Sequence, residues 1–374
     1  MAAVSLVGAA EPDRFVRGDL TILNLILPGP GHPRNSEGSF VALRDGRILF
    51  AYSKFTSGGD DADHAYIAAR YSQDGGQSWT EDSTLLENEA ALNVMSVSLL
   101  RLKDGRIAFF YLRKEAPNLC IPYVRFSSDE ARTWSEAVRA IAEDGYYVLN
   151  NDRVVQLRRG RLIMPVAIHT DASHRLVERG TVTVYLSDDS GRTWRRAGTV
   201  LKCPTPSPEG LQEPGVVELK DGRVMMFIRT RLGRQYVSYS ADRGESWSAA
   251  EPSNMLSPQS PALIKRIPNT GDLLLVWNNH SKVDPSFRAV DQSGPGQKVW
   301  WGTRTPLTVA ISRDEGRHWV KAKNIEDNPE GRYAYPALFF EGDRVFLAYA
   351  AGGEGAGSLA RTRIALFDLK WLYK

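Results

Sequence analysis

The stretch SQDGGQSW, residues 72–79, is the first of five copies of one eight-residue pattern. The pattern has Ser first, Asp third, Gly fifth and Trp eighth, and the second copy carries Ala131 in place of Gly. A repeat of this size indicates supersecondary units that stack or surround an axis and form one domain together. Successive copies lie 55, 60, 53 and 72 residues apart, starting at Ser72, Ser127, Ser187, Ser240 and Ser312.

Six hairpin patterns alternate with these copies. Each has alternating apolar residues on both sides of a tight turn, usually Asp-Gly-Arg, in which Gly takes the positive φ. Five hairpins are followed by a copy of the repeat on the next hairpin, and two hairpins make the four-stranded antiparallel blade of a propeller. The six hairpins cover residues 42–52, 101–112, 156–167, 218–229, 267–278 and 340–350.

We therefore predict an all-β, six-bladed β-propeller in which residues 1–374 form a single domain, with about sixty residues in each blade. The sixth hairpin is followed only by a strand pattern at 361–369. We expect segment 19–27 to complete that blade, because pairing both chain ends closes the ring and removes an open edge. Residues 1–14 are expected to be a poorly ordered extension.

Composition narrows the function classes. The 47 basic and 44 acidic residues leave a net charge of +3, which argues against nucleic-acid binding. The apolar runs are too short to span a membrane. The segment MAAVSLVGAA has no basic region and makes a poor signal peptide, so the location is secreted or periplasmic if a signal peptide was removed, and cytoplasmic otherwise. The oligomeric state stays open.

The aspartates of the repeat are expected to be structural. Asp in a turn accepts backbone N–H bonds, Gly takes the left-handed conformation, and Trp packs between sheets. We therefore place these aspartates on the outer rim of the ring, away from the chemistry: Asp74, Asp189, Asp242 and Asp314.

The repeat and the hairpins together resemble the sialidase (neuraminidase) superfamily, whose six-bladed propellers carry this motif as the Asp box or BNR repeat. The resemblance covers essentially the full length. It implies an exo-acting, retaining glycoside hydrolase with a glycan substrate and no metal or organic cofactor. In that family three arginines clamp the substrate carboxylate, a Tyr paired with a Glu is the nucleophile, and a loop Asp is the acid/base. A neutral Tyr avoids the repulsion that a carboxylate nucleophile would meet beside the substrate carboxylate.

The fourth unit matches this family best. Its segment QEPGVVELKDGRVMMFIRT, residues 212–230, resembles the family segment in which Glu precedes one strand and Arg ends the next. The resemblance implies that Glu213 activates the nucleophile and that Arg229 is a clamp arginine, with Gln212 beside them in the substrate site. Arg304, in RTPLTVAISRDEG, resembles a second clamp arginine.

Tyr335, in RYAYPALFFEGDRVFLAYA, falls on the family nucleophile. Tyr333 stands two residues earlier and would share a strand face with it, so it is a competing candidate. The acid/base is expected in the loop of SKFTSGGDDADHAYIAARYS, where we prefer Asp61 and Asp63 without choosing between them. A solvated acidic loop or a cation site is the alternative for these aspartates.

The first unit departs from the family pattern. The expected Arg-Ile-Pro motif is replaced in HPRNSEGSFVALRDG, where Ser36 and Glu37 stand in place of Arg and Ile. Arg34, two residues earlier, is the candidate for the missing clamp arginine. Glu37 would repel a substrate carboxylate unless it is paired, and it would suit a sugar hydroxyl.

Further polar residues stand where strands converge on the propeller axis. Asn151, Asp152 and Arg153 open the third unit, and His169 ends its second strand. We expect them to surround a central substrate pocket, with a structural Asp152–Arg153 ion pair as an equal alternative. His169 is expected to line the site and not to bind metal, because no second His stands at ligand spacing.

These residues lead to one main hypothesis and two rivals. The first is a sialidase-type enzyme that releases a terminal nonulosonic acid such as sialic acid. The second is a hydrolase of the same fold that acts on another terminal sugar with a carboxylate pair including Glu37 and Glu213. The third is a glycan-binding propeller without catalysis.

Overall fold

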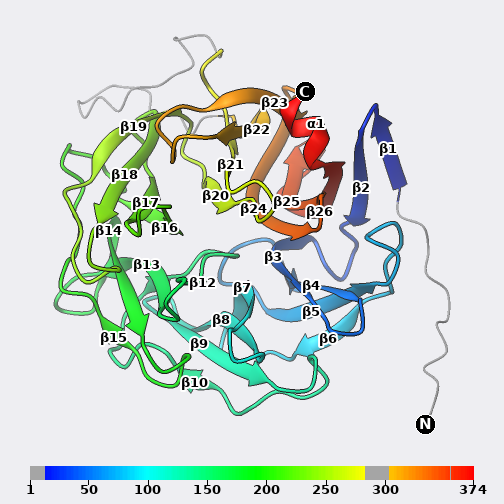
Figure 1. Ribbon diagram of the computed structural model, residues 1–374. Helices are drawn as coiled ribbons and strands as arrows, with labels where there is room; N and C mark the ends of the chain where they lie inside the picture. The colour runs from blue at the N-terminus through cyan, green and yellow to red at the C-terminus, as the bar shows by residue number, and fades with distance from the viewer. Residues whose placement is uncertain (1–12, 283–302, 354) are drawn as a thin grey trace.

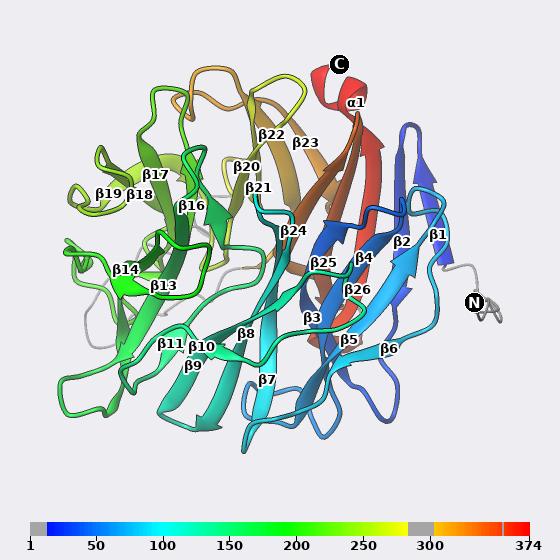
Figure 2. The ribbon, with the colours of Figure 1, turned by 60° about the horizontal axis from the view of Figure 1, so that its bottom comes forward.

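The computed structural model describes residues 13–282, 303–353 and 355–374. Six antiparallel sheets stand around a common axis, and consecutive sheets along the chain are neighbours in the ring (Figure 1). Figure 2 shows the same ring of sheets after a turn about the horizontal, with the bottom of Figure 1 brought forward. The expected all-β, six-bladed propeller is confirmed.

Blades one to three follow one another from the first hairpin onward. Blade one is built from β3 (Arg34–Ala42), β4 (Ile48–Phe55), β5 (Ala65–Ser72) and β6 (Ser83–Leu86). Blade two is built from β7 (Asn93–Arg101), β8 (Ile107–Ala116), β9 (Leu119–Ser127) and β10 (Val138–Arg139). Blade three is built from β11 (Tyr147–Val148), β12 (Val155–Gln156), β13 (Leu162–Thr170), β14 (Leu176–Ser187) and β15 (Arg195–Arg196).

Blades four to six complete the ring. Blade four is built from β16 (Gln212–Glu218), β17 (Val224–Arg229), β18 (Arg234–Ser240) and β19 (Glu251–Leu256). Blade five is built from β20 (Leu263–Arg266), β21 (Leu273–Asn278), β22 (Leu307–Ser312) and β23 (Val320–Glu326). Blade six is built from β24 (Gly331–Glu341), β25 (Arg344–Gly353), β26 (Ala356–Asp368), β2 (Leu20–Ile26) and β1 (Asp13–Arg17), and is followed by α1 (Leu369–Tyr373). In the described residues, no helix is long and apolar enough to cross a membrane.

The ring closes as expected, by pairing of the two chain ends. β2 pairs antiparallel with β26, so segment 19–27 supplies the fourth strand of blade six. A fifth strand, β1, then pairs with β2 and includes Asp13 and Arg14. The expectation of a poorly ordered extension over 1–14 is therefore wrong for its last two residues, and residues 1–12 lie outside the described part.

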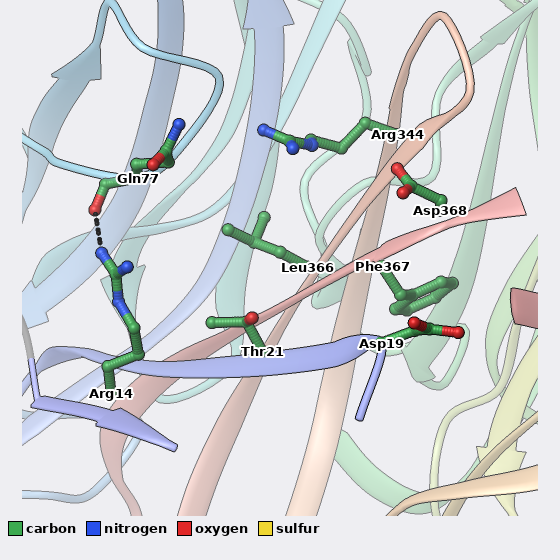
Figure 3. A pocket seen from close by; sticks show the side chains of 8 residues that line it. All are labelled: Arg14, Asp19, Thr21, Gln77, Arg344, Leu366, Phe367 and Asp368. Carbon is green, nitrogen blue, oxygen red and sulfur yellow. Dashed lines mark hydrogen bonds between the residues drawn. The ribbon is translucent and has the colours of Figure 1, made fainter. Parts of the chain in front are cut away.

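Blade six is held to blade one by side-chain bonds as well as by packing. Figure 3 shows Arg14 of β1 donating to the carbonyl oxygen of Gln77, at 3.0 Å. Arg344 of β25 donates to the carbonyl oxygen of Gly75, also at 3.0 Å. Both acceptors belong to the first copy of the repeat, so this turn helps to close the ring.

The seam between these blades also has an aromatic core. Phe40 of β3 lies 4.6 Å from Phe50 of β4 and 6.1 Å from Phe346 of β25, measured between ring centroids. Trp79, from the first copy of the repeat, packs into the same buried cluster. Aromatic pairs of this kind add about 0.5–1.5 kcal/mol each beyond the area they bury.

The repeat is a self-contained turn between the third and fourth strands of its blade. In the first copy the Asp74 carboxylate accepts the Ser72 hydroxyl at 2.9 Å, and the backbone N–H and hydroxyl of Ser78 at 2.9 and 2.6 Å. The Trp79 indole donates to the carbonyl oxygen of Gly76 at 3.1 Å. The other four copies bind their aspartates in the same way. A structural role for these aspartates agrees with these bonds.

Four inner strands carry the same irregularity. In each, two residues stand opposite one on the neighbouring strand, which is a β-bulge, and the first of the two has positive φ. A bulge turns one side chain out of the regular alternation and often lies beside an active site. The four bulge residues are Glu37 of β3, Ser96 of β7, Glu213 of β16 and Tyr335 of β24.

Candidate active site

All four bulge side chains line one cavity of about 500 Å³. This volume lies within the range of small-molecule sites in proteins. The cavity is bounded by blades one to four and six, with Gln259 between blades four and five. Seven of the residues expected from the sequence line it: Glu37, Asp61, His169, Gln212, Glu213, Arg229 and the expected nucleophile Tyr335.

Tyr335 and Glu213 form a hydrogen-bonded pair at this cavity. The Tyr335 hydroxyl donates to Glu213 Oε1 at 3.3 Å, and Arg229 Nη1 donates to the same oxygen at 2.6 Å. Burial and then the Glu213 charge raise the pKa of Tyr335 to about 12, although Arg304 and Arg229 act in the opposite direction. The phenol is therefore neutral at neutral pH, with a carboxylate placed to take its proton.

The three expected clamp arginines differ in how they relate to this pair. Arg229 lines the cavity and bonds Glu213. The Arg304 guanidinium lies 5.6 Å from the centre of the Tyr335 ring. Arg34 bonds two residues that line the cavity, Glu37 and Asp61. Arg229 and Arg304 thus contact the Tyr335–Glu213 pair, whereas Arg34 bonds Glu37 and Asp61; Arg34 and Arg304 are not among the residues that line the cavity.

Glu37 is paired, which removes the repulsion that an isolated carboxylate would cause. Its Oε2 accepts Arg34 Nη2 at 3.0 Å and its Oε1 accepts the Ser96 hydroxyl at 3.2 Å. Only 5% of the Glu37 side chain is exposed. Burial raises the pKa of Glu37, and the Arg34 charge opposes that rise.

Asp61, and not Asp63, is the loop acid that faces the site. Asp61 lines the cavity, and its Oδ1 accepts Arg34 Nη1 at 2.6 Å. Asp63 instead accepts the backbone N–H of Asp60 within the loop, at 2.8 Å. Asn93 of β7 holds the loop by donating to the carbonyl oxygens of both Asp61 and Asp63, at 2.8 and 2.9 Å. The expectation for Asp63 is revised to a structural role.

Tyr333 does not compete with Tyr335. In a regular strand, Tyr333 and Tyr335 would lie on the same face. The bulge at Tyr335 breaks this alternation in β24, so the two side chains lie on different faces. Tyr333 is 1% exposed and packs edge-to-face on Tyr349 in the core, with ring centroids 6.1 Å apart. The competing assignment is therefore wrong.

Asn151, Asp152 and Arg153 are buried and are not among the residues that line the cavity. Asn151 Nδ2 donates to the carbonyl oxygen of Tyr335 at 3.3 Å, and so supports the bulge. Asp152 pairs with Lys265 at 2.7 Å and accepts the backbone N–H of Leu338 at 2.9 Å.

The alternative reading, an ion pair between Asp152 and Arg153, is wrong, because Asp152 pairs with Lys265 instead. Arg153 is fully buried and stacks over the Phe227 ring at 5.4 Å. None of its side-chain nitrogens has a hydrogen-bond partner among the described residues. The role expected for these three residues is revised from substrate contact to support of the site.

His169 lines the cavity as expected. Its Nδ1 lies 3.2 Å from the carbonyl oxygen of Val177, and burial lowers the pKa of the ring, which favours the neutral form. No group of three His, Cys, Asp or Glu side chains suited to a metal ion occurs in the part of the chain that the structure describes.

Several lining residues escaped the sequence prediction, among them Ser96, Glu209 and Arg231. Glu209 and Arg231 form a buried ion pair. Ser96 carries a detectable signal, because it precedes the glycine of its hairpin turn, Gly105, by nine residues, and Glu37 and Glu213 precede theirs by the same number (105 − 96, 46 − 37 and 222 − 213). The Glu209–Arg231 pair has no such regularity.

Comparison with known proteins agrees with this architecture. A model of the BNR repeat-like domain matches residues 46–347. The sialidase of Micromonospora viridifaciens is 26% identical over 381 residues, which cover 91% of this chain and 52% of the relative. The chain therefore spans about half the length of the curated relative that it matches.

Solved structures share the fold at lower identity. A protein of unknown function from Dyadobacter fermentans aligns with 94% of this chain and 100% of its own, at 18% identity and a TM-score of 0.71. Trypanosoma rangeli sialidase in complex with 2,3-difluoro-KDN aligns with 96% of this chain and 59% of its own, at 14% identity and the same TM-score of 0.71. Because the domain model matches most of its length, the chain belongs to the BNR repeat-like domain family, and its fold is the six-bladed β-propeller that these solved structures share.

Proposed function

We propose that this chain is an exo-acting glycoside hydrolase that releases a terminal nonulosonic acid, such as sialic acid, with retention of configuration. One observation carries the proposal: the Tyr335 hydroxyl donates to Glu213 at the cavity surface, with Arg229 on the same carboxylate oxygen. A phenol activated by a carboxylate and surrounded by cations suits attack on an anomeric carbon that bears a carboxylate.

The geometry supports a two-step reaction. In the first step Tyr335 attacks the anomeric carbon, Glu213 takes the phenol proton, and Asp61 protonates the leaving oxygen. In the second step Asp61 deprotonates a water that attacks the tyrosyl-linked carbon, Glu213 returns the proton to Tyr335, and the sugar leaves. Two inversions at one carbon give net retention.

The arginines supply binding energy for the substrate carboxylate. A guanidinium offers two parallel N–H donors that match a carboxylate, and such charge-assisted bonds are stronger than neutral ones. Arg229 bonds the carboxylate partner of Tyr335 and Arg304 lies over the Tyr335 ring, so a substrate carboxylate bound by both would hold the anomeric carbon near the phenol oxygen. These residues need no metal ion for binding or for proton transfer.

The direct test is covalent trapping. A 3-fluorosialosyl fluoride forms the glycosyl-enzyme rapidly, and this intermediate then hydrolyses slowly. The reagent should therefore add one sugar to the peptide that contains Tyr335, as seen by mass spectrometry. Turnover of an aryl α-sialoside followed by ¹H NMR should give the α-anomer first. Label on another residue, or first formation of the β-anomer, would contradict the mechanism.

A second candidate is hydrolysis of a different terminal sugar. The observation that favours it is Glu37, a buried carboxylate that lines the cavity where the family pattern has an isoleucine. Glu37 with Glu213 would then form the catalytic pair. Turnover of neutral or uronic aryl glycosides without turnover of the sialoside would establish this alternative.

A further inference from the structure

Arg34 already donates to four acceptors in the structure. Its Nε donates to Ser36 Oγ at 3.2 Å and its Nη2 to Glu37 Oε2 at 3.0 Å. Its Nη1 donates to the carbonyl oxygen of Gly59 at 3.1 Å and to Asp61 Oδ1 at 2.6 Å. A guanidinium has five N–H donors, so a ligand carboxylate that needs two of them must displace one of these acceptors.

Asp61 is the acceptor that can leave. Its side chain is 62% exposed, whereas those of Arg34 and Glu37 are 4% and 5% exposed. It lies on the loop between β4 and β5, and water can solvate its carboxylate once Arg34 is given up. If the ligand displaced Glu37 instead, this buried carboxylate would lose its counter-ion. Breaking a buried ion pair costs far more than breaking an exposed one.

We propose that Asp61 competes with the substrate carboxylate for Arg34, so that a carboxylate-bearing sugar releases this loop acid on binding while a neutral sugar leaves it held. The inference rests on the proposed function and adds a specificity rule to it. The carboxylate of the substrate is then needed for the proton transfer as well as for affinity, and Asp61 determines which sugars react.

The exchange changes the proton affinity of Asp61. The charged groups around Asp61 are Arg34 and Glu37 of β3, Lys114 of β8 and Arg229 of β17, with the thiol of Cys120 and the phenol of Tyr146 nearby. The exposed surface of Asp61 faces the cavity, and the surrounding walls raise its pKa by desolvation, but the charge and the hydrogen bond of Arg34 outweigh this and hold the pKa below its usual value.

Held by Arg34, Asp61 is therefore ionised and is a poor proton donor. When a ligand carboxylate takes Arg34, this stabilisation of the Asp61 anion is lost and another negative charge arrives next to it. Asp61 then takes up a proton from solvent, and that proton is the one it delivers to the leaving oxygen. Binding of a carboxylate ligand is thus coupled to proton uptake.

The test is calorimetric titration with 2-deoxy-2,3-didehydro-N-acetylneuraminic acid in two buffers of different ionisation heat at pH 6. Wild-type protein should take up close to one proton for each ligand bound. In Asp61→Asn the uptake should disappear, and the ligand should bind about tenfold more tightly, because an amide competes less well for Arg34. Asp60→Asn, which removes a neighbouring carboxylate of the same loop, should behave as wild type.

Three outcomes separate the hypotheses. Unchanged proton uptake and unchanged affinity in Asp61→Asn would overturn the competition between Asp61 and ligand, as would weaker binding of the ligand. If either result is found while the wild-type protein hydrolyses an aryl sialoside, the proposed function stands and only this inference fails. A wild-type protein that neither binds the ligand nor hydrolyses the sialoside contradicts both.

Discussion

Replacing Glu213 by Gln removes the proton acceptor of Tyr335 while keeping an oxygen that Arg229 can bond. The pKa of Tyr335 is raised to about 12. At pH 7 a phenol of this pKa is ionised in about one molecule in 10⁵, so forming the phenolate from bulk water costs about 7 kcal/mol. A positioned general base avoids much of this cost and contributes about 10²–10⁴ in rate. We therefore expect kcat at pH 6 to fall by about 10²–10⁴ in the variant.

The pH dependence of the variant is the more specific result. Without a base, phenolate must form by ionisation, so log kcat should rise with unit slope as the pH increases. The rise should continue toward the pKa of Tyr335, which falls in the variant because the Glu213 charge helps to raise it. The assay is hydrolysis of an aryl α-sialoside with a good leaving group, since this substrate needs little help from Asp61.

Two observations would refute this reasoning. One is a Glu213→Gln variant with the wild-type rate at pH 6, which would show that another group takes the proton. The other is a large loss of kcat that is independent of pH up to pH 10, which would show that Tyr335 is not the nucleophile. Tyr335→Phe is the control, and it should be inactive throughout this range.

Three further predictions concern stability. Arg153→Met should raise the free energy of unfolding by about 1–3 kcal/mol in chemical denaturation, because it removes a buried cation whose side-chain nitrogens have no hydrogen-bond partner among the described residues. Lys265→Met should lower it by about 3 kcal/mol, because the buried Asp152 carboxylate loses its counter-ion. Gly76→Ala should lower it by about 2 kcal/mol or more and reduce the melting temperature, because φ is +84° and the new Cβ would lie 2.4 Å from the Phe346 ring.

Each of these changes has a matched control. Arg153→Lys keeps the charge and should not stabilise the protein, and a destabilised Arg153→Met would contradict the first prediction. Addition of Asp152→Asn to Lys265→Met should recover part of the lost stability. Gly46→Ala has a similar φ of +86° but open space around the new Cβ, so it should cost less than Gly76→Ala. Equal costs for the two glycine variants would exclude the contact with Phe346 as a cause.

The propeller was predictable because its signals are local. Each copy of the repeat satisfies its own polar groups within eight residues, as Ser72, Asp74 and Trp79 show, so the pattern survives in the sequence whatever lies around it. Ring closure followed from counting strands, since an unpaired edge is unfavourable. The resemblance to a known family then indicated Glu213, Arg229 and Tyr335, which the structure brings together.

The contacts within the site, in contrast, join residues that lie far apart in the sequence or depend on an irregularity of one strand. Alternation along a strand placed Tyr333 and Tyr335 on one face, and only the bulge of β24 separates them. Asp61 bonds Arg34 across 27 residues of chain, and Asp152 pairs with Lys265 across 113. Nothing near Asp152 in the sequence indicates that its partner is Lys265 and not the adjacent Arg153.

Short-range sequence patterns thus determine the fold and which segments form each blade, because each turn and hairpin is stabilised by residues close together in the chain. The selection of Asp61 over Asp63, the pairing of Arg34 with Glu37, and the exclusion of Tyr333 arise only when six inner strands converge on one axis. Convergence decides which charges share a buried space, and pairing within that space determines what each side chain can do.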